Sequence, residues 1–455
     1  MPNGLTARLL DRATELGAAS VGVAGADLFE QELLTLREQK LTGRSGPLHF
    51  TYDDPESATD IRRSFPWAKR ILVVGWDYLE GGAAPAESGA VVGRFATSDH
   101  YRELTRITGA LADDLEENGF RAEILIDDNR LVDRAAAVRA GVGWSGKSTM
   151  VLTPGHGPWM LLGSVVTDAP LEASTPMVRD CGTCVACYPA CPTNALSDQG
   201  LDARRCLSTW LQTRGSIPHW IRPHLGRRIY GCDECLTACP PGKRALETSQ
   251  PQPLDLPFTD LLALSDAGLI DRFSWWYVPI RDGRYLRRNI LVAAGNSGED
   301  AAWNPITEHL EHPSSMIRGV AAWATARSSP NEARETVRRR LDVETVPETR
   351  EELMLALLMI ESPNTYHAIL LADEWANTTE EVRGLALLGM DTDGPGSHLE
   401  LLGLHSGISP AKAPDLPPEV ALTLVQSSIE IKGDLANLVR IYDPDRSLET
   451  LRRDA

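Results

Sequence analysis

The chain has 455 residues, of which 42% are hydrophobic and 24% charged, and its formal net charge is −18 at pH 7. This length allows two or three domains with cores of their own, and the composition is typical of a globular protein. The strong negative charge excludes a protein that coats nucleic acid indiscriminately. No apolar run approaches the ~20 residues of a membrane helix, and the amphipathic, acid-containing N-terminus does not resemble an export signal.

Residues 1–170 alternate between helical and extended patterns, which predicts an α/β domain. We expect helices over Leu5–Leu16, Tyr101–Asn118 and Leu131–Ala140. We expect strands over Ser20–Val23, Ala122–Ile126, Thr149–Thr153 and Met160–Val166, and another strand that begins at Arg70.

Gly141–Ser148 satisfies the nucleotide-binding pattern G-x4-G-K-[ST]. A phosphate-binding loop of that kind follows a strand and opens a helix. Here the predicted order is reversed, because a helix precedes the motif and a strand follows it. We therefore expect a glycine-rich turn that allows close backbone approach to a flat or phosphate-bearing ligand, and no nucleotide site.

All eight cysteines lie between residues 181 and 239. Cys181, Cys184, Cys187 and Cys191-Pro192 have the bacterial ferredoxin spacing, in which the fourth cysteine binds the other cluster of a two-cluster protein. The second half of the region lacks one cysteine of that pattern, and Cys206 can supply it. The spacing predicts a ferredoxin-like domain over residues 171–250 with two 4Fe-4S clusters.

The same crossing rule predicts which cysteines share a cluster, since each C-P cysteine serves the neighbouring cluster. The first cluster is expected on Cys181, Cys184, Cys187 and Cys239. The second is expected on Cys191, Cys206, Cys232 and Cys235. Oxygen-sensitive clusters without an export signal indicate a cytoplasmic protein. Two structural zinc sites are the alternative, and a disulfide framework suits this chain poorly.

The stretch from Leu201 to Arg244 carries eight basic and three acidic residues, against the acidic trend of the rest. Such a basic island can bind a phosphate backbone at one place. It can equally neutralise the negative charge of thiolate clusters, and the sequence alone leaves both interpretations open.

The C-terminal part, residues 285–455, contains an internal repeat. An arginine recurs at intervals of 31, 32 and 33 residues, and each has a small residue six positions later. The arginines are Arg287, Arg318, Arg350 and Arg383, and the small residues are Ala293, Ala324, Ala356 and Gly389. This period predicts a HEAT-like α-solenoid, joined to the ferredoxin-like domain by a helical connection over 251–284.

These motifs together resemble the epoxyqueuosine reductases, cobalamin- and 4Fe-4S-dependent enzymes that complete the queuosine base in tRNA. The resemblance rests on Arg139–Lys147, the eight-cysteine region, Leu201–Cys206, Arg228–Cys232 and Arg287–Ser297. It is good from about residue 90 to 330 and thin at the N-terminus, and the tail beyond about 345 exceeds the usual family length. It implies a cobalamin-binding α/β domain, the two-cluster domain and a solenoid that helps to hold the anticodon stem-loop.

Position by position, the resemblance implies that Asp127 is the proton donor beside the corrin. It places corrin contacts at Val151, Leu162 and Ser208, and a tRNA contact at Arg214. From the residues alone, Asp127 could instead cap the helix Leu131–Ala140. The chain departs from the family at Asp128-Asn129-Arg130, at Leu211 where a threonine is common, and at Asp99-His100-Tyr101, where the family has Asp-Tyr-His.

We therefore expect an oxidoreductase that reduces the epoxide of epoxyqueuosine in tRNA, with electrons from a flavodoxin- or ferredoxin-type donor. A monomer suffices to act on one anticodon loop. The alternatives are a cobalamin and iron–sulfur reductase of another substrate, such as a halogenated small molecule, and a non-catalytic electron-transfer protein.

Overall fold

The computed structural model describes residues 2–79, 83–249 and 252–378. Its contacts divide the chain into two units, which are described separately. The first unit comprises Met1–Ala86, Val92–Trp210 and Tyr230–Leu254, and the second comprises Glu87–Val91, Leu211–Ile229 and Asp255–Ala455. The predicted boundary at residue 170 falls inside the first unit, and the segment Leu211–Ile229 belongs to the helical second unit.

A four-stranded antiparallel sheet forms the centre of the first unit. Its strands lie in the order β1 (Ser20–Gly25), β2 (Arg70–Asp77), β8 (Met160–Thr167) and β5 (Ala122–Ile126). These elements confirm the strands predicted near residues 20, 70, 122 and 160. Because side chains alternate across a strand, Ile71 and Val73 of β2 enter one apolar cluster while Leu72 and Val74 enter the other.

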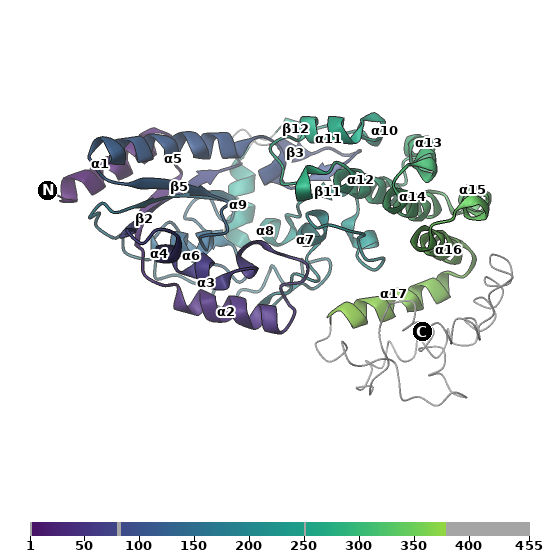
Figure 1. The fold of residues 1–455 in the computed structure, drawn as a ribbon, viewed down its shortest axis with the longest axis horizontal. Helices are drawn as coiled ribbons and strands as arrows, with labels where there is room; N and C mark the ends of the chain where they lie inside the picture. The colour runs from purple at the N-terminus through teal and green to yellow at the C-terminus, as the bar shows by residue number, and fades with distance from the viewer. Residues whose placement is uncertain (1, 80–82, 250–251, 379–455) are drawn as a thin grey trace, which may run out of the picture. The chain divides into compact units, whose positions relative to one another are not determined.

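Helices cover both faces of this sheet (Figure 1). On one face lie α1 (Pro2–Glu15) and α5 (His100–Glu117), whose apolar residues Leu9, Leu104 and Leu111 pack on it. The other face carries α2 (Glu30–Leu41), α3 (Pro55–Thr59), α4 (Ile61–Ser64) and α6 (Asp133–Arg139). The first unit thus contains the predicted α/β layers.

The glycine-rich turn has the element order expected from the sequence. It follows α6 and leads into a short antiparallel hairpin of β6 (Trp144–Ser145) and β7 (Val151–Leu152). Gly141 has φ +72°, and a Cβ atom there would lie 2.5 Å from the carbonyl oxygen of Thr175, so this position requires glycine. The predicted strand Thr149–Thr153 is shorter than expected, because Thr149 adopts a left-handed φ of 65°.

The cysteine region contains little regular structure. Its elements are β9 (Leu196–Ser197), β10 (Gly200–Leu201), α7 (Leu207–Leu211), α8 (Glu234–Thr237) and α9 (Pro240–Thr248). Cys239 is the N-cap of α9, and Pro240 occupies the first helical position, where its missing N–H costs nothing. Cys191-Pro192 forms a turn and opens no helix. The remaining short elements between residues 50 and 254 are η1 (Phe50–Tyr52), β3 (Ala83–Pro85), β4 (Val91–Val92), η2 (Arg94–Ala96), η3 (Arg222–Leu225), β11 (Arg228–Tyr230) and β12 (Gln252–Leu254).

The rest of the second unit is helical throughout its described residues. Its elements are α10 (Phe258–Ala263), α11 (Asp266–Arg272), η4 (Pro279–Arg281), α12 (Arg284–Ser297), η5 (Asp300–Ala302), α13 (Trp303–Glu308), η6 (His309–Glu311), α14 (Ser315–Ser328), α15 (Pro330–Val343), α16 (Pro347–Glu361) and α17 (Pro363–Thr378). The repeated helices α12, α14 and α16 pack in succession, and their small repeat residues Ala293, Ala324 and Ala356 are fully buried. The fourth copy, with Arg383 and Gly389, lies outside the described residues.

The repeated arginines perform one structural task. Arg287 binds Asp266 (2.6 Å), and Arg318 binds Glu344 (2.7 Å). Arg350 donates to the carbonyl oxygens of Leu341 and Glu344. Each guanidinium therefore ties its helix to a neighbouring segment and satisfies groups that would otherwise be buried without partners.

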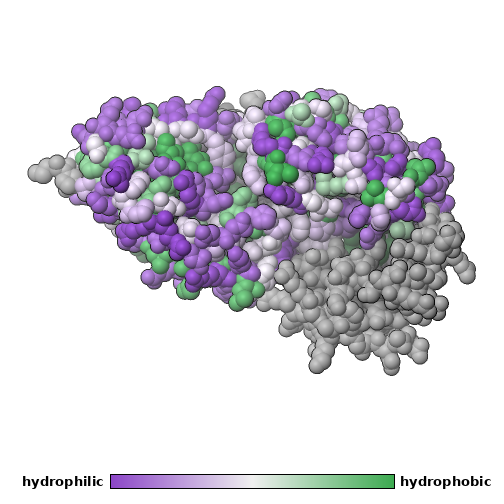
Figure 2. All heavy atoms as spheres, viewed as in Figure 1, coloured by the Kyte–Doolittle hydropathy of each residue, from purple (hydrophilic) through white to green (hydrophobic). Residues whose placement is uncertain are grey.

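Among the described helices, none is long and apolar enough to cross a membrane. On the face shown in Figure 2, hydrophilic side chains predominate and apolar ones gather in small separate groups.

Candidate functional site

The first predicted group of cysteines lies together in the first unit. Burial raises the pKa of the Cys187 thiol, and the neighbouring Cys181, Cys239 and Cys184 raise it further. Cys181 and Cys239 pack around Trp144 and Leu152 of the hairpin. The structure thus brings together the four cysteines that the crossing rule assigns to one cluster.

The glycine-rich turn contacts this first group. The backbone N–H of Lys147 donates to the Cys181 sulfur over 3.4 Å, and its ammonium donates to the Gly182 carbonyl over 2.9 Å. Gly143 lies so close to β7 that a Cβ atom there would meet the Leu152 carbonyl oxygen at 2.5 Å. The glycine-rich turn is therefore packed closely within the protein, against its own hairpin and the cysteine loop, and its approach to a flat or phosphate-bearing ligand stays a prediction.

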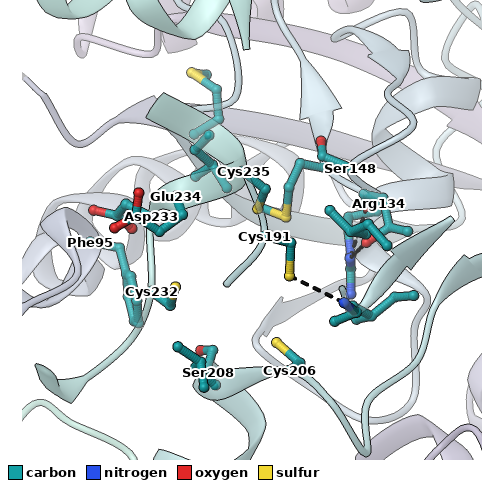
Figure 3. Close-up of a pocket in the computed structure, with 18 of the residues that line it drawn as sticks. Phe95, Arg134, Ser148, Cys191, Cys206, Ser208, Cys232, Asp233, Glu234 and Cys235 are labelled. Atoms are coloured by element: carbon teal, nitrogen blue, oxygen red, sulfur yellow. Dashed lines mark hydrogen bonds between the residues drawn. The ribbon is translucent and has the colours of Figure 1, made fainter. Parts of the chain in front are cut away.

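The second predicted group surrounds a cavity of about 310 Å³ in the first unit. Cys191, Cys206, Cys232 and Cys235 all line it (Figure 3). Burial raises the pKa of Cys235, and the thiols of Cys232, Cys206 and Cys191 add to this effect. Four thiols lining one cavity are a fitting ligand set for a cubane cluster.

Backbone amides point at these sulfurs. The N–H of Ala195 donates to the Cys191 sulfur over 3.2 Å, the contact dashed in Figure 3. The amides of Ser208 and Thr209 oppose the effect of burial at Cys206, because a hydrogen bond to sulfur favours the thiolate. Such N–H groups stabilise the charged form that binds iron.

The remaining cavity wall is mainly apolar and aromatic. Tyr78, Phe95, Met150, Met160 and Leu161 contribute to it. Tyr78 is fixed by an edge-on contact with Trp159, at 6.0 Å between ring centroids. A broad, flat ligand with an apolar face suits such a wall.

The predicted corrin contacts do not all reach this cavity. Ser208 lines it. Val151 instead packs into the core beneath the sheet, and Leu162 packs against that core. Their chain neighbours Met150 and Leu161 line the cavity in their place. A role for the side chains of Val151 and Leu162 in corrin binding stays a prediction that this geometry does not favour.

Asp127 follows β5 in a left-handed conformation with φ 51°. It does not cap the next helix, since α6 begins at Asp133 and its N-cap residue, Val132, makes no side-chain cap. This result contradicts the capping alternative. A non-glycine residue in this region is uncommon and points to a constraint on the loop.

The electrostatics of Asp127 suit a proton-holding group. Its side chain is solvent-accessible but recessed among protein atoms, so loss of hydration raises the pKa of its carboxyl. Arg134 and a hydrogen bond from Tyr101 act in the opposite direction. Asp127 itself is not part of the cavity wall, but Tyr101 and Arg134 both are. Through these two residues the carboxyl is linked to the cavity.

Sequence reasoning missed Tyr101 as a site residue. In the reversed Asp-His-Tyr triplet, His100 is buried and contacts Ser98 at 3.0 Å, while Tyr101 faces Asp127. The order of His100 and Tyr101, reversed relative to the family, was the sequence signal that could have pointed to Tyr101.

The departure at 128–130 forms an ion pair. Asp128 accepts from the backbone and the guanidinium of Arg130, and this hydrogen bonding lowers the pKa of Asp128. Arg130 also lies over the ring of Phe65, 5.0 Å from its centroid. Arg130 also lies 3.6 Å from the Glu123 carboxylate of β5, so its charge is balanced by Asp128 and Glu123 together.

Arg214 lies in the second unit on an exposed loop. The buried Arg288 of α12 donates to the carbonyls of Thr213 and Gly215 on either side of it. The amide of Asn289 donates to the carbonyls of Leu211 (2.8 Å) and Ile229 (3.0 Å). The segment Leu211–Ile229 is thus held at both ends by one side chain.

The basic island is not uniformly available for binding. Arg204 pairs with Asp202 (2.8 Å), and the fully buried Arg222 pairs with Glu352 (2.8 Å). Arg214, Lys243 and Arg244 are exposed. Part of the island is therefore structural, in both units.

Comparisons with known proteins agree with this site. The 4Fe-4S double cluster binding domain family matches residues 180–242. The epoxyqueuosine reductase of Bacillus subtilis is 30% identical over 370 residues, which cover 77% of this chain and 94% of the relative. The enzyme of the same name from Xanthomonas campestris is 32% identical over 71% of this chain and 96% of its own.

The fold also has solved counterparts. The crystal structure of an epoxyqueuosine reductase with an epoxyqueuosine-modified tRNA-Tyr stem loop superposes with a TM-score of 0.69 at 28% identity, covering 79% of this chain and 99% of that one. The match to the double-cluster family favours iron–sulfur clusters over the zinc alternative. The chain belongs to the epoxyqueuosine reductase family.

Proposed function

We propose that this protein reduces the epoxide of epoxyqueuosine to the alkene of queuosine in tRNA. The observation that carries this proposal is the cavity on which Cys191, Cys206, Cys232 and Cys235 converge, with the Asp127–Tyr101 pair adjoining it. Membership of the epoxyqueuosine reductase family supports the same reaction.

Two 4Fe-4S clusters would be held by the two cysteine groups, with the ligand sets given above. Cobalamin would occupy the cavity region beside the second group, where Tyr78, Met150, Met160, Leu161 and Ser208 offer a largely apolar wall. The converging thiols and this wall fit the two kinds of cofactor. When bound, these cofactors would relay the two electrons that the reaction needs from an external donor to the substrate.

The protein's own residues manage the protons. Loss of an epoxide oxygen as water consumes two electrons and two protons, so an acid must protonate the departing oxygen. Asp127 is that acid in our proposal, since partial loss of hydration raises the pKa of its carboxyl and favours the protonated form. Tyr101 orients the carboxyl through its hydrogen bond.

The RNA would be bound in part by the second unit. Arg214 is exposed on a loop fixed by Arg288 and Asn289, which suits contact with a phosphate backbone. The packed helices α12, α14 and α16, with their repeated arginines, support a HEAT-like solenoid that helps to hold the anticodon stem-loop. We also propose a cytoplasmic monomer, and the domain divisions 1–170, 171–250, 251–284 and 285–455.

The direct test is anaerobic. Protein reconstituted with iron, sulfide and cobalamin is incubated with epoxyqueuosine-containing tRNA and dithionite, and the nucleosides are then analysed by mass spectrometry. We expect conversion to queuosine. Full cofactor uptake without conversion would overturn the substrate assignment, and cluster assembly without cobalamin uptake would indicate an electron-transfer protein.

A further inference from the structure

Trp144, on the glycine-rich turn, carries a buried donor that the protein's own groups do not satisfy. Its side chain is only 8% exposed. Its indole Nε1 atom is buried and has no hydrogen-bond partner among the residues that the structure describes. Buried polar groups are nearly always hydrogen-bonded, because an unpaired donor loses its hydration without compensation. The indole N–H therefore needs an acceptor in the functional protein.

The surroundings of Trp144 belong to the first cysteine group. Trp144 shares an apolar cluster with Leu152 and Cys239, and Met177 and Cys181 pack against it. Both cysteines are predicted ligands of the first cluster. Leucine offers no acceptor and a thioether only a weak one, and a bridging water needs two or more polar partners. The sulfurs of the first group are thus the acceptors that this apolar cluster can supply.

The glycine-rich turn fixes the position of Trp144. Trp144 of β6 pairs with Leu152 of β7 in the short hairpin. A Cβ atom at Gly143 would lie 2.5 Å from the carbonyl oxygen of Leu152, and one at Gly146 would lie 3.1 Å from that of Met150. The two glycines therefore allow the hairpin to close tightly, and the closed hairpin holds the indole among the cysteines.

Backbone N–H groups already donate to the same two cysteines. The amide of Lys147, three residues after Trp144, donates to the Cys181 sulfur over 3.4 Å. Burial raises the pKa of the Cys239 thiol, and a hydrogen bond from the Gly242 amide opposes this effect. Donors from the turn and from α9 thus point at the first group, as negatively charged sulfurs require.

We propose that the Nε1–H group of Trp144 donates a hydrogen bond to a sulfur of the first cluster and thereby raises its midpoint potential. Reduction adds one electron to the cluster and breaks no bond. The added negative charge strengthens a hydrogen bond to sulfur, so the donor favours the reduced state. The inference depends on the proposed function only for the ligand set of the first cluster, and it can be tested without RNA.

The test uses two substitutions of Trp144 in the full-length holoprotein. Trp144→Phe removes the N–H group but also shrinks the ring. Incorporation of 3-benzothienylalanine at position 144 keeps the bicyclic shape and replaces the N–H group by sulfur. Trp67→Phe is the matched control, because Trp67 packs on the α/β core beneath Arg121, as Trp144 lies beneath Arg179. Iron content and cluster absorbance establish that each protein is intact.

The measurement is an anaerobic redox titration followed by electron paramagnetic resonance. Both proteins altered at Trp144 should show a reduction equilibrium constant of the first cluster about 10-fold lower, because one charge-assisted hydrogen bond is lost. For a one-electron couple this fall corresponds to a midpoint potential lower by about 59 mV. The second cluster should keep its potential, and Trp67→Phe should match the wild type in both.

Resonance Raman spectroscopy supplies a readout that a purely structural role would not change. Exchange into D2O should shift the Fe–S stretching bands of the wild type, because N–D replaces N–H at the sulfurs. The benzothienylalanine protein should show a smaller shift, since only the backbone donors remain. The Trp67→Phe control should show the full wild-type shift.

An unchanged first-cluster potential in the benzothienylalanine protein would overturn the proposal. A fall in Trp144→Phe alone would also overturn it, because the effect would then come from packing. Two assembled clusters with the expected shift, but without conversion of epoxyqueuosine in the assay above, would leave this inference standing and overturn the proposed function. A wild-type protein that assembles no 4Fe-4S cluster would overturn both.

Discussion

The two cysteine groups of the first unit share the C-x2-C motif and differ in their surroundings. The group around Cys184 reaches the surface, beside a turn whose Lys147 amide faces Cys181. The group around Cys235 lines the cavity, with aromatic walls and the Asp127–Tyr101 pair close by. This difference in environment supports the proposed division of roles, in which electrons would enter at the first group and the chemistry would take place beside the second.

The largest expected effect is the loss of turnover and iron when one cysteine ligand is removed from either group. Cys235→Ser should abolish turnover with any reductant and remove about half of the iron, because each cluster needs its four thiolates. Cys184→Ser should also lose about half of the iron and all flavodoxin-driven turnover, yet keep part of its dithionite-driven turnover. Iron analysis and the two assays check this. Equal loss in both variants with dithionite would contradict the proposed division.

The next effect concerns the proton. Asp127→Asn should lower kcat by about 10²–10⁴-fold, since general acid catalysis contributes on that scale. Cofactor content and RNA affinity should remain unchanged. Asp128→Asn is the comparison variant: it removes the neighbouring negative charge that raises the pKa of Asp127, so it should move the pH profile to lower pH without the large loss of kcat. Wild-type turnover in Asp127→Asn would exclude Asp127 as the donor.

The pH profile sharpens the role of Tyr101. Because Asp127 donates only when protonated, kcat should fall as pH rises through its pKa. The Tyr101 hydrogen bond lowers the pKa of Asp127, so Tyr101→Phe should raise that pKa and move the fall to higher pH, by about one unit. Profiles of kcat against pH for both proteins measure the shift. A shift to lower pH would show that Tyr101 acts in another way.

The smallest expected effect is on the midpoint potential of the first cluster alone. Lys147→Met removes the ammonium from the Gly182 carbonyl but keeps the backbone amide at the Cys181 sulfur. We expect a small fall in the midpoint potential of the first cluster, because a nearby positive charge favours the reduced state. The second cluster should be unaffected, as a redox titration with spectral resolution of the clusters will show. A change confined to the second cluster would reverse the assignment of the turn.

Much of the first unit could be predicted because its signals are local. The strands near residues 20, 70, 122 and 160 follow from buried apolar runs, and the cysteine spacing places each C-x2-C pair on one loop. It was harder to predict which face of its strand each side chain occupies. Val151 and Leu162 each lie one residue from a cavity-lining neighbour, and in a strand one residue changes the face.

Other features depend on distant contacts that no short pattern reveals. The left-handed conformation of Asp127 and the pairing of Tyr101 with its carboxyl join two elements through tertiary structure. The carbonyls around Arg214 are bound by Arg288, whose position is set by α12 far along the chain. The repeat of arginines was visible in the sequence, but their common task became clear only from their partners Asp266 and Glu344.

The double hydrogen bond of Asn289 has a consequence for evolution. One buried amide closes the segment between Leu211 and Ile229, so the anchoring of its ends does not depend on the side chains between them. Only the exposed residues around Arg214 can diverge at low cost, because Ile217, Ile221 and Arg222 are fully buried within the segment. Exchange of the exposed turn Arg214-Gly215-Ser216 between relatives would therefore test its proposed contact with RNA while the buried part of the segment stays in place.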